Sequence, residues 1–326
     1  MNNLIKLAAA IPVSDAVPIL AASPVTLSTP DRGLDLEMKV TAPVTDRDLP
    51  IILLSHGHGP SLYIPSLHGY GPLADFWAAH GFVVIQPTHL NSKVAGLDPS
   101  APGGPAFWRS RVEDMVRILD RLDEVVAQVP TLAGRVDPTR IAAAGHSLGG
   151  QTVGMLLGAR LTDPHDPGAI DVNLKDSRIK VGVLLAAPGR GGNDLNPAMA
   201  ANPAFSFLNP DFSHLTTPAL VIVGDADVSP HLTPRSADWH ADAYHLSPGA
   251  DFLLTLYGGK HGLGGVAGYE AAETTDEDPD RLAVVQRLSC AYLRTALNPG
   301  DPAWSDASDA LRVGAASLAR VESKSQ

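Results

Sequence analysis

The stretch RIAAAGHSLGGQTVGMLLGAR, residues 140–160, places a serine between two apolar segments of different character. Small apolar residues precede Gly145, and after Ser147 the sequence continues with the spacing of a buried helix. Such a pattern is typical of a buried strand that turns directly into a helix. Ser147 would lie in the turn, where Gly145 and Gly149 let strand and helix approach. The alternative is an ordinary helix start with Ser147 as its N-cap.

The rest of the chain alternates short apolar runs with amphipathic helical segments, which favours a three-layer α/β fold with a parallel sheet. Most strand candidates are continuous apolar runs, as strands covered on both faces must be. These candidates are residues 49–57, 81–87, 140–146, 179–188, 218–225 and 251–259. Residues 34–40 alternate instead and are predicted to form an early antiparallel edge strand.

Two long segments have helical periodicity, residues 109–126 and 278–297. The apolar face of the first comprises Val112, Met115, Val116, Leu119 and Leu122. The chain shows no internal repeat and no low-complexity linker, so we predict one domain over residues 1–326. Within it, residues 1–33 are expected to be an N-terminal extension and residues 188–217 a short lid-like insertion that is too small for a separate domain.

Composition narrows the classes of partner. The formal net charge is −11 and only 18% of residues are charged, which argues against nucleic acid and anionic membranes and favours a small, largely uncharged ligand. Cys290 is the only cysteine, so the sequence excludes an intramolecular disulfide and a cysteine-rich zinc site. No stretch is long and apolar enough to be a membrane span, and Pro12 and Asp15 interrupt the apolar start. We therefore expect a cytoplasmic protein, with export as the alternative.

The segments SHGHGP at 55–60 and GHSLGG at 145–150 resemble the α/β-hydrolase family. They are most similar to its bacterial esterase, dienelactone-hydrolase-like and platelet-activating-factor-acetylhydrolase-like members, and chlorophyllases are similar around the serine. The resemblance implies the α/β-hydrolase fold, with a mostly parallel sheet of about eight strands and helices on both faces. It also implies a nucleophile elbow, a catalytic triad in the order Ser, Asp or Glu, His, and no cofactor.

Ser147 is the nucleophile in this resemblance, and its partners must follow it in the chain. A serine hydroxyl needs an imidazole to take its proton and a carboxylate to orient that imidazole. Asp227 lies three residues after Gly224 at the end of a predicted strand, which is the spacing usual for the family's acid, but Asp225 in the same turn remains an alternative. His261 follows the last predicted strand in a glycine-rich loop, at the sheet edge where α/β folds bind ligands.

Three further histidines follow the aspartate candidates, namely His231, His240 and His245. The last two belong to a predicted helix and are interpreted as surface residues. Before the serine, His56 and His58 follow a predicted strand. The resemblance places the oxyanion-hole amides at His58 and Leu148. The alternative is that His56 and His58, two residues apart, point the same way and ligate a metal in a metal-dependent hydrolase.

The loops beyond the predicted strand ends contain aromatic residues and few charges. Tyr63, Trp108, Phe205 and Phe207 are therefore candidate walls of a substrate pocket, although loop aromatics also simply pack a loop onto the protein. An apolar pocket favours a hydrophobic carboxylic ester as substrate over a peptide or a phosphoester. We predict a serine esterase without a metal. A hydrolase-fold receptor that binds a ligand with little turnover is a further possibility.

Overall fold

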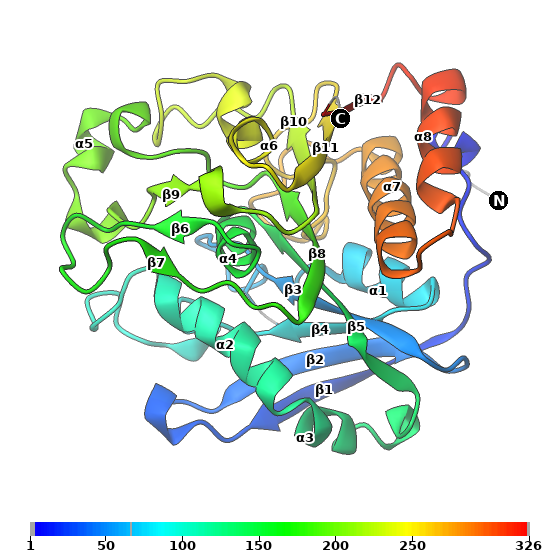
Figure 1. The fold of residues 1–326 in the computed structure, drawn as a ribbon, viewed down its shortest axis with the longest axis horizontal. Coiled ribbons are helices and arrows are strands. Elements are labelled where there is room, and N and C mark those ends of the chain that lie inside the picture. Colours follow the sequence, from blue (N-terminus) through cyan, green and yellow to red (C-terminus); the bar gives the residue numbers. More distant parts are fainter. Residues whose placement is uncertain (1–3, 66, 325–326) are drawn as a thin grey trace.

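The computed structural model describes residues 4–65 and 67–324. Its centre is a nine-stranded sheet with the order β1-β2-β4-β3-β5-β8-β10-β11-β12 (Figure 1). The strands are β1 (Ile19–Leu27), β2 (Leu36–Pro43), β3 (Leu49–Ser55), β4 (Val83–Pro87), β5 (Val136–His146), β8 (Ile179–Leu185), β10 (Ala219–Gly224), β11 (Ala250–Leu256) and β12 (Ala319–Ser323). Neighbours from β4 to β11 pair in parallel, whereas β1, β2 and β12 pair antiparallel. The predicted α/β class with a mostly parallel central sheet is confirmed.

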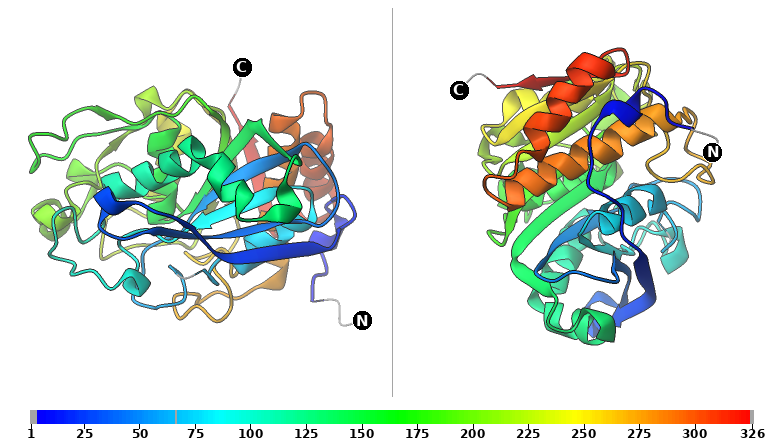
Figure 2. Two further views of the ribbon diagram at one scale, coloured as in Figure 1. Left: turned by 90° about the horizontal axis from the view of Figure 1, so that it is seen from below. Right: turned by 90° about the vertical axis from the view of Figure 1, so that its right-hand side faces the viewer.

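Helices cover both faces of this sheet. On one face pack α1 (Gly71–Ala79), α7 (Pro279–Leu297) and α8 (Ala303–Gly314), of which α7 and α8 lie side by side (Figure 2). The other face carries α2 (Trp108–Asp120), α3 (Leu122–Ala127), α4 (Leu148–Leu156) and α6 (Asp242–Leu246). None of the helices in residues 4–65 and 67–324 has the length and hydropathy that a membrane span requires.

Shorter elements complete the chain. A small separate sheet is formed by β6 (Arg160–Leu161), β7 (Val172–Asn173) and β9 (Pro210–Asp211). One further short helix is α5 (Pro197–Ala200), and the 3-10 turns are η1 (Ala8–Ala10), η2 (Pro30–Arg32), η3 (Lys93–Ala95), η4 (Pro130–Leu132), η5 (Gly192–Asp194), η6 (Pro203–Phe205), η7 (Phe212–His214) and η8 (Ala237–Ala241). Residues 188–217, the predicted lid-like insertion, consist of such short elements, from η5 to η7.

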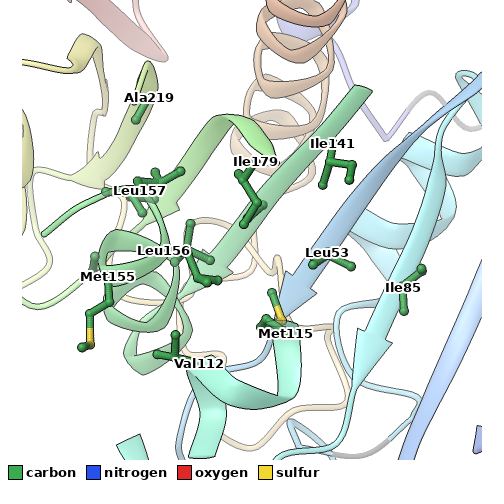
Figure 3. Close-up of a cluster of buried hydrophobic side chains, with 14 of the residues drawn as sticks. Leu53, Ile85, Val112, Met115, Ile141, Met155, Leu156, Leu157, Ile179 and Ala219 are labelled. Atoms are coloured by element: carbon green, nitrogen blue, oxygen red, sulfur yellow. The ribbon is translucent and has the colours of Figure 1, made fainter. Parts of the chain in front are cut away.

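Successive residues of the inner strands point to opposite faces of the sheet and pack into two hydrophobic cores, one on each face. Along β3, Leu53 belongs to the cluster under α2 and α4, while its neighbour Ile52 belongs to the cluster under α1 and α7. Figure 3 shows part of the first cluster, in which Leu53 of β3, Ile85 of β4 and Ile141 of β5 lie on the sheet face that α2 covers with its Met115. Because both faces of the inner strands are covered, these strands consist of continuous apolar residues. This continuity made them recognisable in the sequence.

The sheet edges differ from the prediction. Residues 34–40 do not form the edge strand, because β2 lies between β1 and β4. The edge is β1, within the segment 1–33 that we interpreted as an extension. Ser23-Pro24 interrupts the β1 pattern and falls at a register shift between Ala22 and Val25, and a proline is tolerated at such an irregularity of an edge strand. The other edge strand, β12, escaped prediction because its sequence is polar.

The helix prediction for residues 109–126 is correct in its buried face but not in its continuity. The backbone leaves the helical conformation at Arg121, where φ is −123°, so α2 ends and α3 begins. The predicted apolar face is buried except for Val116, which is half-buried. In α7, which corresponds to residues 278–297, the carboxylate of Asp278 caps the first turn and Cys290 is fully buried in the core.

Candidate active site

Ser147 lies in the predicted strand-to-helix turn, between β5 and α4. Its backbone angles, φ 56° and ψ −124°, are unfavourable for a residue with a side chain and mark local strain. The Ser147 side chain does not cap α4, so the interpretation of this serine as an ordinary N-cap is wrong. Its N–H donates to the carbonyl of Leu185 at 2.9 Å, and its own carbonyl accepts from Gly150 at 2.8 Å. The turn is held by backbone bonds, and the hydroxyl has no hydrogen-bond partner among residues 4–65 and 67–324.

Gly149 lets this turn pass close to the end of β3. A β-carbon at Gly149 would lie 2.1 Å from the carbonyl oxygen of Ser55, whereas a β-carbon at Gly154 in the same helix would meet nothing closer than 4.0 Å. We expect Gly149→Ala to destabilise the fold by about 3 kcal/mol, since backbone must move to relieve the clash. The matched variant Gly154→Ala should be neutral or stabilising by up to about 1 kcal/mol, because alanine favours a helix.

Urea unfolding of the two glycine variants tests this expectation. A Gly149→Ala protein as stable as the wild type would show that the turn does not need the close approach seen here.

His261 and Asp227 form a hydrogen-bonded pair at the carboxyl ends of β11 and β10. The distance between Nδ1 of His261 and Oδ2 of Asp227 is 2.9 Å, and the Asp227 side chain is 2% exposed against 41% for His261. Burial by itself would raise the pKa of Asp227, but the hydrogen bond from His261 and the charges of His261 and His240 outweigh it and hold this pKa below its ordinary value. The carboxylate therefore stays ionised at neutral pH and fixes the hydrogen of His261 on Nδ1, which leaves Nε2 basic.

Asp225, the alternative acid, has another partner. Its Oδ1 accepts a hydrogen bond of 2.6 Å from the N–H of Gly258, so it ties the end of β10 to the loop after β11. This is the turn-capping role common for aspartate. The structure thus brings Asp227, and not Asp225, to His261.

Ser147 and His261 line one cavity of about 560 Å³. Its walls are largely apolar and include Leu148, Met199, Phe205, Phe207, Leu208 and Leu232. Four of these, Met199, Phe205, Phe207 and Leu208, come from the insertion 188–217. The hydroxyl of Ser147 makes no hydrogen bond to His261 in the described chain, and such bonds often tighten only when a substrate is bound.

Two of the predicted wall residues lie elsewhere. Trp108 lines a different hollow beside α2, where the guanidinium of Arg109 sits 4.9 Å from its ring centroid. The Tyr63 hydroxyl donates to Glu270 at 3.4 Å, and its ring is not part of the wall of the 560 Å³ cavity. Both aromatic side chains thus pack against their own local surroundings, Trp108 at the start of α2 and Tyr63 in the loop after β3.

The loop after β3 reaches the serine from the other side. A β-carbon on Gly57 would lie 3.3 Å from Cβ of Ser147, and the next residue, His58, lines the cavity. Arg111 of α2 holds this loop from below, because its buried guanidinium donates to the carbonyl of His56 and to Oγ1 of Thr152 in α4. Leu148 is the first residue of α4, where amides have no acceptor within the helix. His58 and Leu148, the residues predicted to supply oxyanion-hole amides, thus both line the cavity together with Ser147.

A buried chain of hydrogen bonds links three of these segments. The Tyr70 hydroxyl accepts from the N–H of Gly57 at 3.0 Å and lies 2.8 Å from Nδ1 of His146. A carbonyl oxygen can only accept, so His146 donates from Nε2 to the carbonyl of His261 at 2.7 Å, and its Nδ1 then accepts from the Tyr70 hydroxyl. The chain connects the loop after β3, the serine turn and the histidine loop. The sequence analysis did not identify Tyr70 or His146.

This chain requires a neutral His146, which makes stability depend on pH. Burial, followed by the nearby His261, lowers the pKa of His146 from 6.5 to about 3. The unfolded chain therefore binds a proton that the folded chain does not, and stability present above pH 6.5 is lost as the pH falls toward 3. The loss approaches about 1.4 kcal/mol per pH unit for one such group.

Unfolding in urea at several pH values between 7 and 4, with chelator present, measures this slope. His146→Gln should flatten it, because glutamine keeps a donor for the His261 carbonyl but does not titrate. An unchanged slope would place the proton uptake on other groups.

His240 is the residue that sequence reasoning misplaced. We interpreted it as a surface residue, but it is buried, and its Nε2 lies 3.3 Å from Oδ2 of Asp227. Of the two histidines in that segment, His245 is the exposed one, as predicted. His231 lines the cavity, on its exposed side. The sequence shows only that Asp227 has apolar neighbours. That pattern indicates a buried carboxylate but does not indicate which histidine packs against it.

His56 and His58, considered above as metal ligands, are not arranged to bind a metal together. His56 is buried, its Nδ1 lies 2.6 Å from the carbonyl of Gly57 and its Nε2 accepts from the N–H of His89 at 3.1 Å, so both ring nitrogens are occupied. Within residues 4–65 and 67–324, the cluster of three potential metal ligands is Asp227, His240 and His261.

Comparison with models of known protein families gives no match, and no curated protein matches the sequence.

Proposed function

We propose that this chain is a serine carboxylester hydrolase of the α/β-hydrolase type that acts on a hydrophobic ester. The observation that carries the proposal is the meeting of Ser147, on its strained turn, with the His261–Asp227 pair in one apolar cavity. The residues needed for acyl transfer come from the ends of three strands of a parallel sheet, β5, β10 and β11, where α/β folds bind ligands.

The first half of the reaction forms an acyl-enzyme. Oγ of Ser147 attacks the ester carbonyl while Nε2 of His261 takes the hydroxyl proton, and Asp227 stabilises the resulting imidazolium. The carbonyl oxygen becomes an oxyanion that accepts hydrogen bonds from the amides of His58 and Leu148. When the carbon–oxygen bond to the alcohol breaks, the imidazolium returns its proton to the leaving alkoxide.

The second half repeats these steps with water. Nε2 of His261 removes a proton from water, the hydroxide attacks the acyl carbonyl, and the proton then goes to Oγ of Ser147 as the acid leaves. No metal or cofactor takes part in this sequence.

The cavity favours an apolar substrate of moderate size. A volume of about 560 Å³ lies in the range of small-molecule sites, roughly 300–1,000 Å³. Apart from Asp227, which is engaged by histidines, the described residues that line the cavity include no carboxylate, lysine or arginine to bind a charged substrate. A hydrophobic acyl chain therefore suits it better than a phosphoester or a charged peptide.

Hydrolysis of p-nitrophenyl esters of increasing acyl length tests this function. We expect kcat/KM to rise with chain length until the acyl group fills the cavity, and activity to survive prolonged treatment with a chelator. Activity lost to the chelator and restored by zinc or manganese would support a metal-dependent hydrolase instead. A protein that binds hydrophobic esters without turning them over would be a receptor.

A further inference from the structure

The carboxylate of Asp227 is shared by two histidines. Oδ2 lies 2.9 Å from Nδ1 of His261 and 3.3 Å from Nε2 of His240, and one ligand atom from each of the three residues lies within 4.8 Å of the others. Asp227 and His240 are both 2% exposed, whereas His261 opens to the cavity. The cluster thus consists of two buried residues, Asp227 and His240, and one that is partly exposed to solvent, His261.

His240 faces a hydrogen-bonding conflict. Its Nδ1 lies 2.9 Å from the carbonyl oxygen of Ala187 and its Nε2 faces the Asp227 carboxylate, so both ring nitrogens face acceptors. A neutral imidazole has only one N–H. With that hydrogen on the shorter contact, to Ala187, the lone pair of Nε2 points toward a carboxylate oxygen. The Ser229 hydroxyl is near enough to donate to Nε2, but at 3.4 Å this hydrogen bond is weak and does little to offset the repulsion between Nε2 and the carboxylate. A cation between Nε2 and Oδ2 would resolve the conflict.

The arrangement suits a metal ion of the zinc class. Histidine nitrogen and aspartate oxygen bind Zn²⁺ at about 2.0–2.2 Å, which puts tetrahedral ligands about 3.4 Å apart. The separation of 3.3 Å between Nε2 of His240 and Oδ2 of Asp227 already matches this spacing. A metal-binding histidine also normally donates its other N–H to a carbonyl or carboxylate, as His240 does to Ala187.

We propose that Asp227, His240 and His261 form a binding site for Zn²⁺ or a similar divalent transition-metal ion, and that the bound ion inhibits the enzyme. The inhibition, though not the binding, rests on the proposed hydrolase function. The ion takes the place of the hydrogen on Nδ1 of His261, and that hydrogen moves to Nε2. An Nε2 that carries hydrogen cannot accept the proton of Ser147, so the nucleophile is no longer activated.

Binding is tested first on Ser147→Ala, which keeps all three ligands and needs no activity. Calorimetric titration with Zn²⁺ should give one ion per chain, and Co²⁺ should give the visible absorption bands typical of a four- or five-coordinate ion. Adding His240→Gln to this protein should weaken Zn²⁺ binding at least tenfold. The matched control is His245→Gln, because His245 is an exposed histidine of the neighbouring helix α6, and it should leave binding unchanged.

Inhibition is tested on the active enzyme. Zn²⁺ should suppress wild-type ester hydrolysis at least tenfold, and a chelator should restore it. His240→Gln, compared with its own metal-free rate, should require at least tenfold more Zn²⁺ for the same suppression.

Two results would overturn the proposal. Absence of binding, or equal affinity with and without His240, would show that only a proton is shared between His240 and Asp227. Binding without inhibition would overturn the regulatory half. A protein that hydrolyses no ester would refute the proposed function, yet the calorimetric result would still decide whether the metal site exists.

Discussion

Ser147→Ala should lower kcat by on the order of 10⁴ or more, the largest loss we expect from any single side chain. The hydroxyl is the atom that bonds to the acyl carbon, and alanine leaves His261 without a nucleophile to activate. The fold should remain intact, because the turn is held by backbone bonds to Leu185 and Gly150 rather than by the hydroxyl. Steady-state kinetics with a p-nitrophenyl ester and a thermal unfolding scan measure both effects.

A fluorophosphonate probe identifies the nucleophile directly. The wild type should be labelled at Ser147, as peptide mapping can show, and Ser147→Ala should not be labelled. Ser229→Ala is the control, because Ser229 lines the same cavity and its substitution also removes a serine hydroxyl. It should still be labelled. An adduct on another residue, or an active enzyme that resists the probe, would refute the acyl-enzyme mechanism.

Asp227→Asn should lower kcat by roughly 10² to 10⁴ near neutral pH, with a small change in KM. An asparagine amide donates a hydrogen bond to Nδ1 of His261, where the carboxylate accepted one. The imidazole hydrogen is then forced onto Nε2, and the ring can no longer take the proton of Ser147. The substituted side chain has the same shape, so the loss is in catalysis rather than in folding.

Asp225→Asn is the matched control, two residues away in the same turn. Its Oδ1 accepts from Gly258, and an asparagine oxygen can keep that bond. We expect nearly full activity and a loss of stability of about 1 kcal/mol or less. An inactive, folded Asp225→Asn beside an active Asp227→Asn would show that the acid lies on the other side of the turn.

The sequence also predicted much of the sheet, but not its edges. The inner strands are buried on both faces, and their continuous apolar runs were visible without the fold. The edge strand β12 is stabilised by pairing with one neighbour, so its residues need not be apolar, and in the other edge strand, β1, Ser23-Pro24 interrupts the pattern. The strand with which an edge strand pairs determines its position, and the residues of the edge strand itself do not show which strand that is.

The sequence by itself determined the strand, turn and helix around Ser147, and the order in which Asp227 and His261 follow strand ends. These features are local, because glycine spacing and apolar periodicity act within a few residues. Only the tertiary structure decided that His240 is buried against Asp227, that Trp108 lies outside the cavity, and that Tyr70 reaches His146. The Tyr70–His146 bond spans 76 positions and the bond from His146 to His261 spans 115. A contact between such distant positions depends on how the whole sheet packs, and no local pattern records it.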